Sequence, residues 1–192
     1  MSAVIIRPLE EATVRHVAVR MRADDRREIA ACVARFDPAE IAARVTALSR
    51  FGGVAVTDAG APAAVVCAAE LHPGVYQAAM FATDDWPCVA LGLTRWIRRT
   101  MVPAMRSVGG HRAECRSIID HRVAHRWLES LGFVREAVLP DFGSGREAFV
   151  QYAWRLSDHE SRGRIASERL PLSVQRSTTV IPCAFSAGPS AK

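Results

Sequence analysis

Residues 121–139 read HRVAHRWLESLGFVREAVL, a stretch that predicts a helix, a stop and then a strand. Helical sequence over 120–130 leads to Gly132, a residue that accepts the left-handed backbone found at many helix C-termini. The segment 133–139 follows as a strand. This stretch is either part of an active site or a motif that only forms the fold. Residues elsewhere in the chain discriminate between the two.

Three more strands are predicted upstream, over 54–57, 63–71 and 75–82. Turn-rich sequence separates them, so we expect an antiparallel meander. A long helix over 88–108 and a strand over 111–118 then connect the meander to the opening stretch.

The N-terminal part of the chain is predicted to be mainly helical. A short strand over 3–6 comes first. The segment 25–28, DRRE, has the spacing of a capping box and predicts a helix start. Asp37 followed by Pro38 is a stronger start signal, and the glycine pair 52–53 is expected to end that helix.

Together these elements predict an α/β (α+β) fold with a central mixed, mainly antiparallel sheet flanked by helices. A last strand is predicted over 147–156. We expect one domain over 1–157, because 192 residues are enough to close a core. Residues 158–192 are polar and lack helical periodicity, so they are predicted to form a flexible C-terminal extension.

The composition predicts a soluble, cytoplasmic protein. Hydrophobic residues make up 49% of the chain, and no apolar run is long enough to cross a bilayer, so no membrane partner is expected. The N-terminus lacks the features of a secretory signal. Five scattered cysteines, odd in number and without a CxxC pair, argue against a disulfide framework or a zinc knuckle and predict buried thiols.

Arginine dominates the basic residues. Of the 25 Lys and Arg residues only Lys192 is a lysine. The segment 88–126 contains eight arginines and only two acidic residues, Glu114 and Asp120. One interpretation is a binding surface for an anion or a nucleic acid; the other is a pair of solvated helix faces.

The element order and the opening stretch resemble the GCN5-related N-acetyltransferase (GNAT) superfamily. Many of its members pass from helix to strand with the pattern N-x-x-A-x-x-L-Y-E-K-L-G-F, which lies over residues 121–133 without gaps. The resemblance covers residues 3–156 in element order. It implies N-acetyl transfer with acetyl-CoA as the cofactor. The matching residues are Ala124, Glu129, Leu131, Gly132 and Phe133.

A narrower resemblance is to GNAT-like proteins of tailed phages, including the internal virion protein A type of short-tailed phages. It is carried by segments 21–29 (MRADDRREI), 126–133 (RWLESLGF) and 149–154 (FVQYAW). It implies a role in the virion or its assembly, with other virion or phage assembly proteins as partners, and a location in the host cytoplasm or the virion.

The resemblance also shows where the chain departs from the family. The family holds the cofactor diphosphate with [QR]-x-x-G-x-[GA] at a helix N-terminus, whereas residues 83–88 read TDDWPC. Asp84 and Asp85 would repel phosphates, and Pro87 has no N–H to donate, so we interpret the two aspartates as helix caps. The candidate cofactor-binding side chains are then arginines of the following helix, Arg95, Arg98 and Arg99.

The acid and the base of the family are also replaced. Leu128 stands at the tyrosine position, and His121 stands at the asparagine position. His121 and His125 are the catalytic candidates, because imidazole titrates near neutral pH. Their i, i+4 spacing could also suit a metal, but no third ligand is in view and no metal site is predicted.

Three hypotheses remain open. The leading one is a phage-type GNAT-fold protein with a degenerate acetyl-CoA site and a virion-associated, assembly or accessory role. The alternative is an active N-acyltransferase that uses acetyl-CoA on an unidentified amine, and it predicts an opening between the fourth and fifth strands with arginines at its mouth. The third is an Arg-rich module that binds an anion or a nucleic acid.

Overall fold

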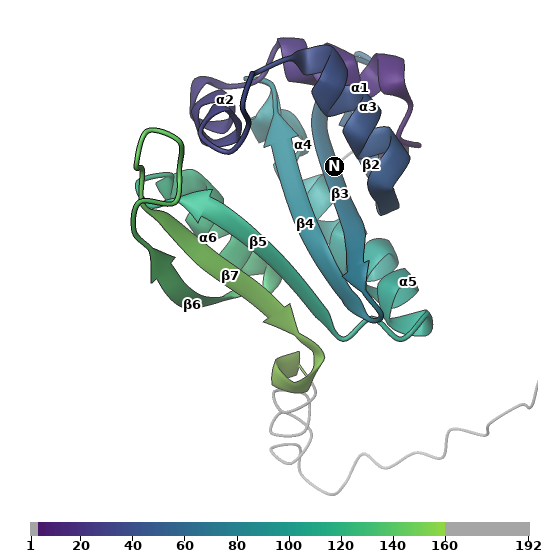
Figure 1. Cartoon of the computed structure of the whole chain (residues 1–192). Helices are drawn as coiled ribbons and strands as arrows, with labels where there is room; N and C mark the ends of the chain where they lie inside the picture. Colours follow the sequence, from purple (N-terminus) through teal and green to yellow (C-terminus); the bar gives the residue numbers. More distant parts are fainter. Residues whose placement is uncertain (1–3, 160–192) are drawn as a thin grey trace, which may run out of the picture.

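The structure of the protein, a computed structural model, describes residues 4–159. Within them, a seven-stranded sheet has the order β1-β2-β3-β4-β5-β7-β6 (Figure 1). Neighbouring strands of this sheet are antiparallel except β4 and β5, which run parallel. The predicted mixed, mainly antiparallel sheet is confirmed. The strands are β1 (Ile5–Arg7), β2 (Ser49–Val56), β3 (Pro62–His72), β4 (Val75–Ala82), β5 (Arg112–Ile118), β6 (Val134–Leu139) and β7 (Phe149–Arg155).

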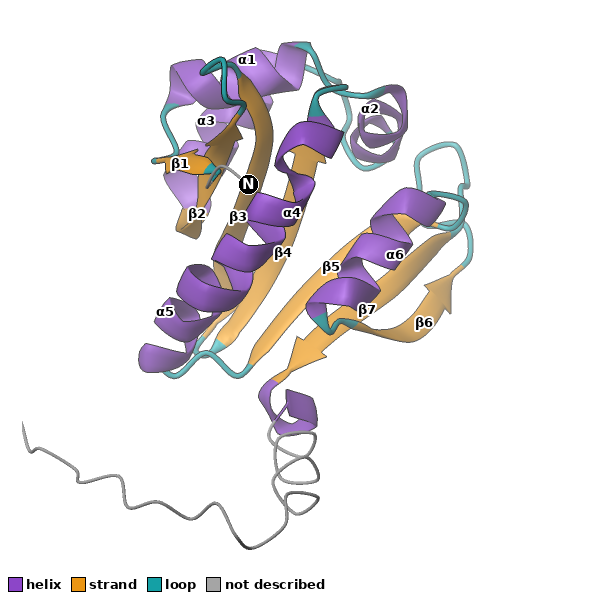
Figure 2. Cartoon of the chain, turned by 180° about the vertical axis from the view of Figure 1, so that it is seen from behind, coloured by secondary structure: helices purple, strands orange, loops and turns teal. Residues whose placement is uncertain are grey.

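Helices cover both faces of the sheet. On one face α4, η1 and α5 continue into each other as one long helix, and α6 lies on the same side (Figure 2). On the other face α1 and α3 pack over β3, while α2 lies near the end of β4 (Figure 1). The helices are α1 (Glu11–Val19), α2 (Ala23–Ala30), α3 (Pro38–Leu48), α4 (Trp86–Trp96), the π-helical η1 (Ile97–Met101), α5 (Val102–Ser107) and α6 (Arg122–Leu131).

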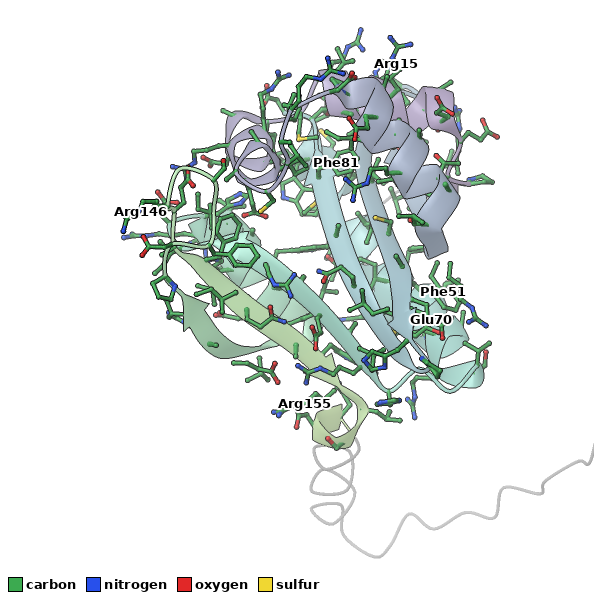
Figure 3. The ribbon with its side chains drawn as sticks, viewed as in Figure 1. Arg15, Phe51, Glu70, Phe81, Arg146 and Arg155 are labelled. Carbon is green, nitrogen blue, oxygen red and sulfur yellow. The ribbon has the colours of Figure 1, made fainter. Side chains whose placement is uncertain are left out.

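Each face of the sheet has its own apolar core. Val14 and Val17 of α1 are fully buried against Phe81 of β4, which is labelled in Figure 3. On the opposite face Leu93 and Ile97 of the long helix pack against the sheet. Burying one such side chain contributes about 1.5–3 kcal/mol, so the two cores hold the sheet rigidly between the helices.

The two middle strands β4 and β5 separate along their length. Their parallel register extends only over Val75–Gln77 and Arg112–Glu114. Beyond Gln77, β4 stays paired with β3 on its other side, and β5 stays paired with β7. The sheet is therefore split in its middle, and the split sits between α2 on one face and α6 on the other (Figures 1 and 2).

The predicted long helix is present with a π-helical segment inside it. In this segment, η1, the N–H of Val102 donates to the carbonyl of Ile97, five residues earlier in the chain. Pro103 follows directly, and a proline ring inside an α-helix clashes with the carbonyl four residues earlier. The wider π turn relieves this clash, which explains its position.

Two predicted boundaries are wrong, and one is confirmed. Gly52 and Gly53 lie inside β2 instead of ending a helix. A Cβ at Gly53 would come within 2.5 Å of Ile6 Cγ2, so a side chain here would force Ile6 of β1 to shift. By contrast, Asp37 Oδ1 accepts a hydrogen bond from the N–H of Ala39 at 2.9 Å, as expected for the cap of α3.

The capping box predicted over 25–28 is not formed. Helix α2 begins two residues earlier, at Ala23, and no side chain caps it. Asp25 points instead into the interior, and the predicted cap residue becomes part of the site described below.

The predicted C-terminal extension, 158–192, lies outside the described residues except for its first two positions. Among residues 4–159, no helix is long and apolar enough to cross a membrane.

Candidate active site

A cavity of about 660 Å³ opens where β4 and β5 separate. Its walls are the second half of β4, the middle of β5, helix α2, the start of α6 and the loop between β6 and β7. That loop crosses toward α2, where the N–H of Ser144 donates to the carbonyl of Ala31 at 2.8 Å. The opening predicted by the active-transferase hypothesis is therefore present.

His121 is the buried histidine of this cavity. It is the N-cap residue of α6, but its side chain caps nothing and is only 4% exposed. Its Nδ1 lies 3.1 Å from Glu28 Oε2, and its Nε2 lies 3.6 Å from Asp25 Oδ1. A carboxylate can only accept, so Nδ1 carries the hydrogen and donates it to Glu28.

Glu28 is held in place by three donors. Its Oε2 accepts from Ser117 Oγ at 2.7 Å and from the N–H of Ile118 at 2.9 Å, in addition to His121. Burial lowers the pKa of His121, but the hydrogen bond and charge of Glu28, with the charge of Asp25, outweigh it and raise that pKa above its ordinary value. The imidazolium form is thus stabilised inside the cavity wall.

Asp25 fastens α2 to the end of β4. Its carboxylate accepts three hydrogen bonds from the Arg22 guanidinium, at 2.9, 2.7 and 2.8 Å, and one from the N–H of Ala82 at 2.8 Å. Burial raises the pKa of Asp25, and Arg22 opposes that shift. With its oxygens occupied, Asp25 positions the neighbouring Glu28 and His121 rather than reacting.

The His121–Glu28 pair can accept and hold a proton. An imidazole is a general base near neutral pH, and a hydrogen-bonded carboxylate on its other nitrogen orients it and stabilises the cation that forms. The sequence indicated His121 but gave Glu28 no catalytic role, because Glu28 appeared there only in the predicted capping box and in the segment 21–29 that carries the phage-type resemblance. The two lie 93 positions apart, so no local signal could have joined them.

His125, the other catalytic candidate, does not line the cavity. Its Nε2 lies 3.1 Å from the carbonyl of Ile118, and its ring lies against Tyr152 at 5.4 Å. Burial lowers the pKa of His125. The helix therefore places only His121 of the predicted pair in the cavity wall.

Arg95, Arg98 and Arg99, the predicted cofactor-binding residues, are exposed on α4 and η1 and do not line the cavity. Arg98 donates to the carbonyl of Ser130 and so links η1 to α6. The arginine that lines the cavity is Arg116, which lies over the ring of Phe142 at 5.4 Å.

The arginines between 88 and 126 do not form one patch. Side chains alternate along β5, and its residues Ala113 and Cys115 pack on the side of the long helix and α6. Arg112 and Arg116 therefore point to the opposite face of the sheet. Arg112 is further paired with Glu136 and Glu114, so it is not free for an anion.

The N-terminus of α4, where the family holds a diphosphate, has no free donors in its first turn. The N–H of Asp85 donates to Thr83 Oγ1 at 3.2 Å, and the N–H of Trp86 donates to the carbonyl of Thr83 at 3.0 Å. The N–H of Cys88 donates to the carbonyl of Asp85 at 3.0 Å, and Pro87 has none. This turn does not fit the diphosphate of acetyl-CoA.

Aromatic side chains join α4 to α6 beside that turn. The rings of Trp86 and Trp127 meet edge to face with centroids 5.3 Å apart. Trp127 Nε1 donates to Thr94 Oγ1 at 2.9 Å, which ties the two helices a second time. Behind them an apolar hollow of about 70 Å³ shares Ala78, Met80 and other wall residues with the cavity.

Among residues 4–159, no three His, Cys, Asp or Glu side chains are placed to hold a metal ion.

Comparison with known proteins finds the fold but no sequence relative. No protein-family model and no curated protein matches the chain. The structure is similar to the ribosomal-protein-S18-alanine N-acetyltransferase from Escherichia coli, with a TM-score of 0.60 and 15% identity over 80% of this chain and 94% of that one. It is similar to Ard1 from Thermoplasma volcanium, with a TM-score of 0.62 and 15% identity over 81% and 99% of the two chains.

A third similar structure is a GNAT superfamily phosphinothricin acetyltransferase from Sinorhizobium meliloti in complex with AcCoA. Its TM-score is 0.62, with 15% identity over 81% of this chain and 89% of that one. At such identities the likeness shows the fold alone. The protein has the fold of the GNAT acetyltransferases.

Proposed function

We propose that the protein is an N-acyltransferase that moves an acyl group from a thioester to a primary amine bound in the cavity. The observation that carries the proposal is the buried His121–Glu28 pair in the wall of an open cavity at the split between β4 and β5. The acetyltransferase fold supports the same reaction class.

The groups of the cavity suit an amine substrate. An alkylamine is protonated at neutral pH, with a pKa near that of lysine, about 10.4, and it must lose a proton before its lone pair can attack a carbonyl. The carboxylate of Glu28 favours the approach of a cation, whereas the charge of Asp25 is matched by that of Arg22. His121 then accepts the proton, and Glu28 stabilises the resulting imidazolium.

The edge of β4 supports the binding of an extended ligand. Ala82 donates its N–H to Asp25, and its carbonyl accepts from the N–H of Arg22, so its peptide group faces the split. Because peptide groups alternate along a strand, that of Met80 faces the split as well. An extended chain with amide groups can hydrogen-bond to such an edge.

The test is acyl transfer by the purified protein, with the product detected by mass spectrometry. Acetyl-CoA and S-acetylpantetheine serve as donors. Three acceptors are offered: a peptide that begins with alanine, phosphinothricin and a simple alkylamine. The first two are chosen after the names of two similar enzymes. We expect His121→Gln to lower the rate about 10²-fold or more, and Glu28→Gln to lower it less.

The exposed His72 provides the matched control, because His72→Gln lies outside the cavity and should leave the rate unchanged. Absence of transfer from both donors, or full activity of His121→Gln, would contradict the proposal.

A second candidate function is a non-catalytic GNAT-fold protein of the phage type with a virion or assembly role. The turn from Thr83 to Cys88 favours it, because the N–H groups of Thr83, Asp85, Trp86 and Cys88 are already bonded and Pro87 has none. The segments 21–29, 126–133 and 149–154 carry the sequence resemblance. This candidate predicts no thioester binding, and it predicts that the polypeptide is found in purified particles.

A further inference from the structure

Two parts of the cleft, the turn at the start of α4 and the edge of β4, indicate which thioester donor the proposed reaction uses. Acetyl-CoA joins an acyl-pantetheine arm to a nucleotide diphosphate. The structure offers a place for the first part and none for the second. The identity of this donor rests on the proposed function.

The first observation is the closed turn at the start of α4. Three of its N–H groups, those of Asp85, Trp86 and Cys88, are bonded to acceptors of the protein, and Pro87 has none. A diphosphate at this helix end would have to break these bonds before it could gain more than the N–H of Asp84, whose own side chain is a carboxylate.

The second observation is the charge around this turn. Asp84 and Asp85 are both exposed, and the first turn of α4 carries no basic residue. The guanidinium of Arg22 lies over this region, 5.4 Å from the centroid of the Trp86 ring. Arg22 is already bonded to the carboxylate of Asp25, so it does not offset the two exposed charges.

The third observation is that α4 and α6 are joined beside the turn. Trp86 and Trp127 are in edge-to-face contact, and Trp127 is bonded to Thr94. Trp86 is buried in this contact. A ligand group inserted between α4 and α6 at this contact would have to displace an indole from the core.

The cleft itself remains open to a narrower chain. Ala78 and Ala79 are small, and the peptide group of Met80 faces the split, where no strand among the described residues pairs with it. The Gln77 side chain reaches the carbonyl of Ala78 only at 3.4 Å, which is a long hydrogen bond. The apolar hollow of about 70 Å³ adjoins this edge and can take a small acyl group.

We propose that the donor is a pantetheine thioester recognised through its acyl-pantetheine arm, without recognition of a nucleotide diphosphate. Pantetheine is an extended chain with two amides, which suits the free edge of β4. The arm could be free or attached to a carrier protein, and both share this chemistry.

The reaction balances without a further reagent. The amine nitrogen forms a bond to the acyl carbonyl carbon, and the bond between that carbon and sulfur breaks. The ammonium nitrogen loses two protons in becoming an amide nitrogen. The first passes to His121 and from there to bulk water, and the second, released after the attack, passes to the departing thiolate. The products are an amide, a free thiol and one proton released to water.

Isothermal titration calorimetry with CoA and with pantetheine tests the inference at low and high salt. We expect CoA to bind more weakly than pantetheine, by about fivefold or more at low salt, and CoA binding to show no loss as salt rises. A protein that binds the diphosphate would instead bind CoA about 100-fold more tightly than pantetheine, and this difference in affinity would fall as the salt concentration rises.

The double variant Asp84→Asn/Asp85→Asn isolates the charge effect. Removal of the two carboxylates should strengthen CoA binding about fivefold or more and leave pantetheine binding unchanged. Asp58→Asn, in the exposed turn between β2 and β3, is the matched control and should change neither.

Transfer assays with acetyl-CoA, S-acetylpantetheine and an acetyl-loaded holo acyl carrier protein separate the sources of the arm. We expect kcat/KM for S-acetylpantetheine to equal or exceed that for acetyl-CoA, and a further gain with the carrier protein would assign the arm to a carrier. A strong preference for CoA in binding and turnover would overturn this inference while leaving the proposed function intact. If neither ligand binds and no donor reacts, both are overturned.

Discussion

The ion pair that fastens α2 to the sheet can be tested by removing Asp25. This side chain is only 4% exposed and accepts hydrogen bonds from Arg22 and from the N–H of Ala82. Asp25→Ala leaves a largely buried guanidinium and a fully buried N–H without their acceptor. The same change releases α2, which carries Glu28 of the candidate site.

The expected loss follows from these contacts. Removing one partner of a buried ion pair typically lowers the free energy of unfolding by about 3–5 kcal/mol. Asp25→Asn keeps an oxygen for the N–H of Ala82 but loses the charge and places an NH2 group where one oxygen accepted from Arg22. Its loss should therefore be smaller than that of the alanine variant by the roughly 1–3 kcal/mol of one unsatisfied buried N–H. Since a domain of this kind has about 5–15 kcal/mol in total, the asparagine variant stays measurable even if the alanine variant is marginal.

Urea unfolding followed by circular dichroism gives both values, with the slope m showing whether the transition stays two-state. Asp58→Ala, a change at an exposed turn, is the control and should stay within about 0.5 kcal/mol of the wild type. The reasoning is refuted if Asp25→Ala lowers the free energy of unfolding by less than about 1 kcal/mol. Equal losses for alanine and asparagine would refute the part assigned to Ala82.

Three further predictions follow from single contacts. The pKa of His121 is higher in the folded than in the unfolded protein. Its contribution to the free energy of unfolding is therefore fully present below about pH 6.5 and is lost as pH rises through the folded pKa. Urea unfolding between pH 5.5 and 8.5 should show this fall in the free energy of unfolding in the wild type and not in His121→Gln. Gly132 has φ of 92°, so Gly132→Ala should lower the free energy of unfolding by about 1–2 kcal/mol and Gly132→Asn by less, and equal losses in thermal unfolding would contradict this. Trp127→Phe and Thr94→Val each remove the same hydrogen bond and should each lower it by about 1 kcal/mol, so the double variant should lose less than the sum.

Much of the fold could be predicted because its signals are local. Asp37 caps a helix that starts at Pro38, and Gly132 ends a helix in the left-handed conformation, as their residue types indicated. The meander of β2, β3 and β4 follows from short apolar runs between turns. The pair Gly52 and Gly53 misled the prediction, because their lack of side chains serves the close approach of neighbouring strands rather than a helix end.

The candidate site was predictable only in part. His121 could be singled out from the family pattern, but Glu28 could not, because its role depends on a contact with a residue 93 positions away. The arginines Arg95, Arg98 and Arg99 were chosen for their charge, and the structure leaves them outside the cavity. A sequence shows which residues are charged. It does not show on which face of the sheet a helix places them.

The sequence by itself determined the order of helices and strands, the stop at Gly132 and the absence of a glycine-rich phosphate turn, because each depends on residues within a few positions of one another. Only the tertiary structure decided that β4 and β5 separate and that His121 meets Glu28 in the resulting cavity. It also decided that the N–H groups around Trp86 are already bonded. These features arise from packing between distant segments, where burial removes water and makes each hydrogen bond and charge count for more than it does along the isolated chain.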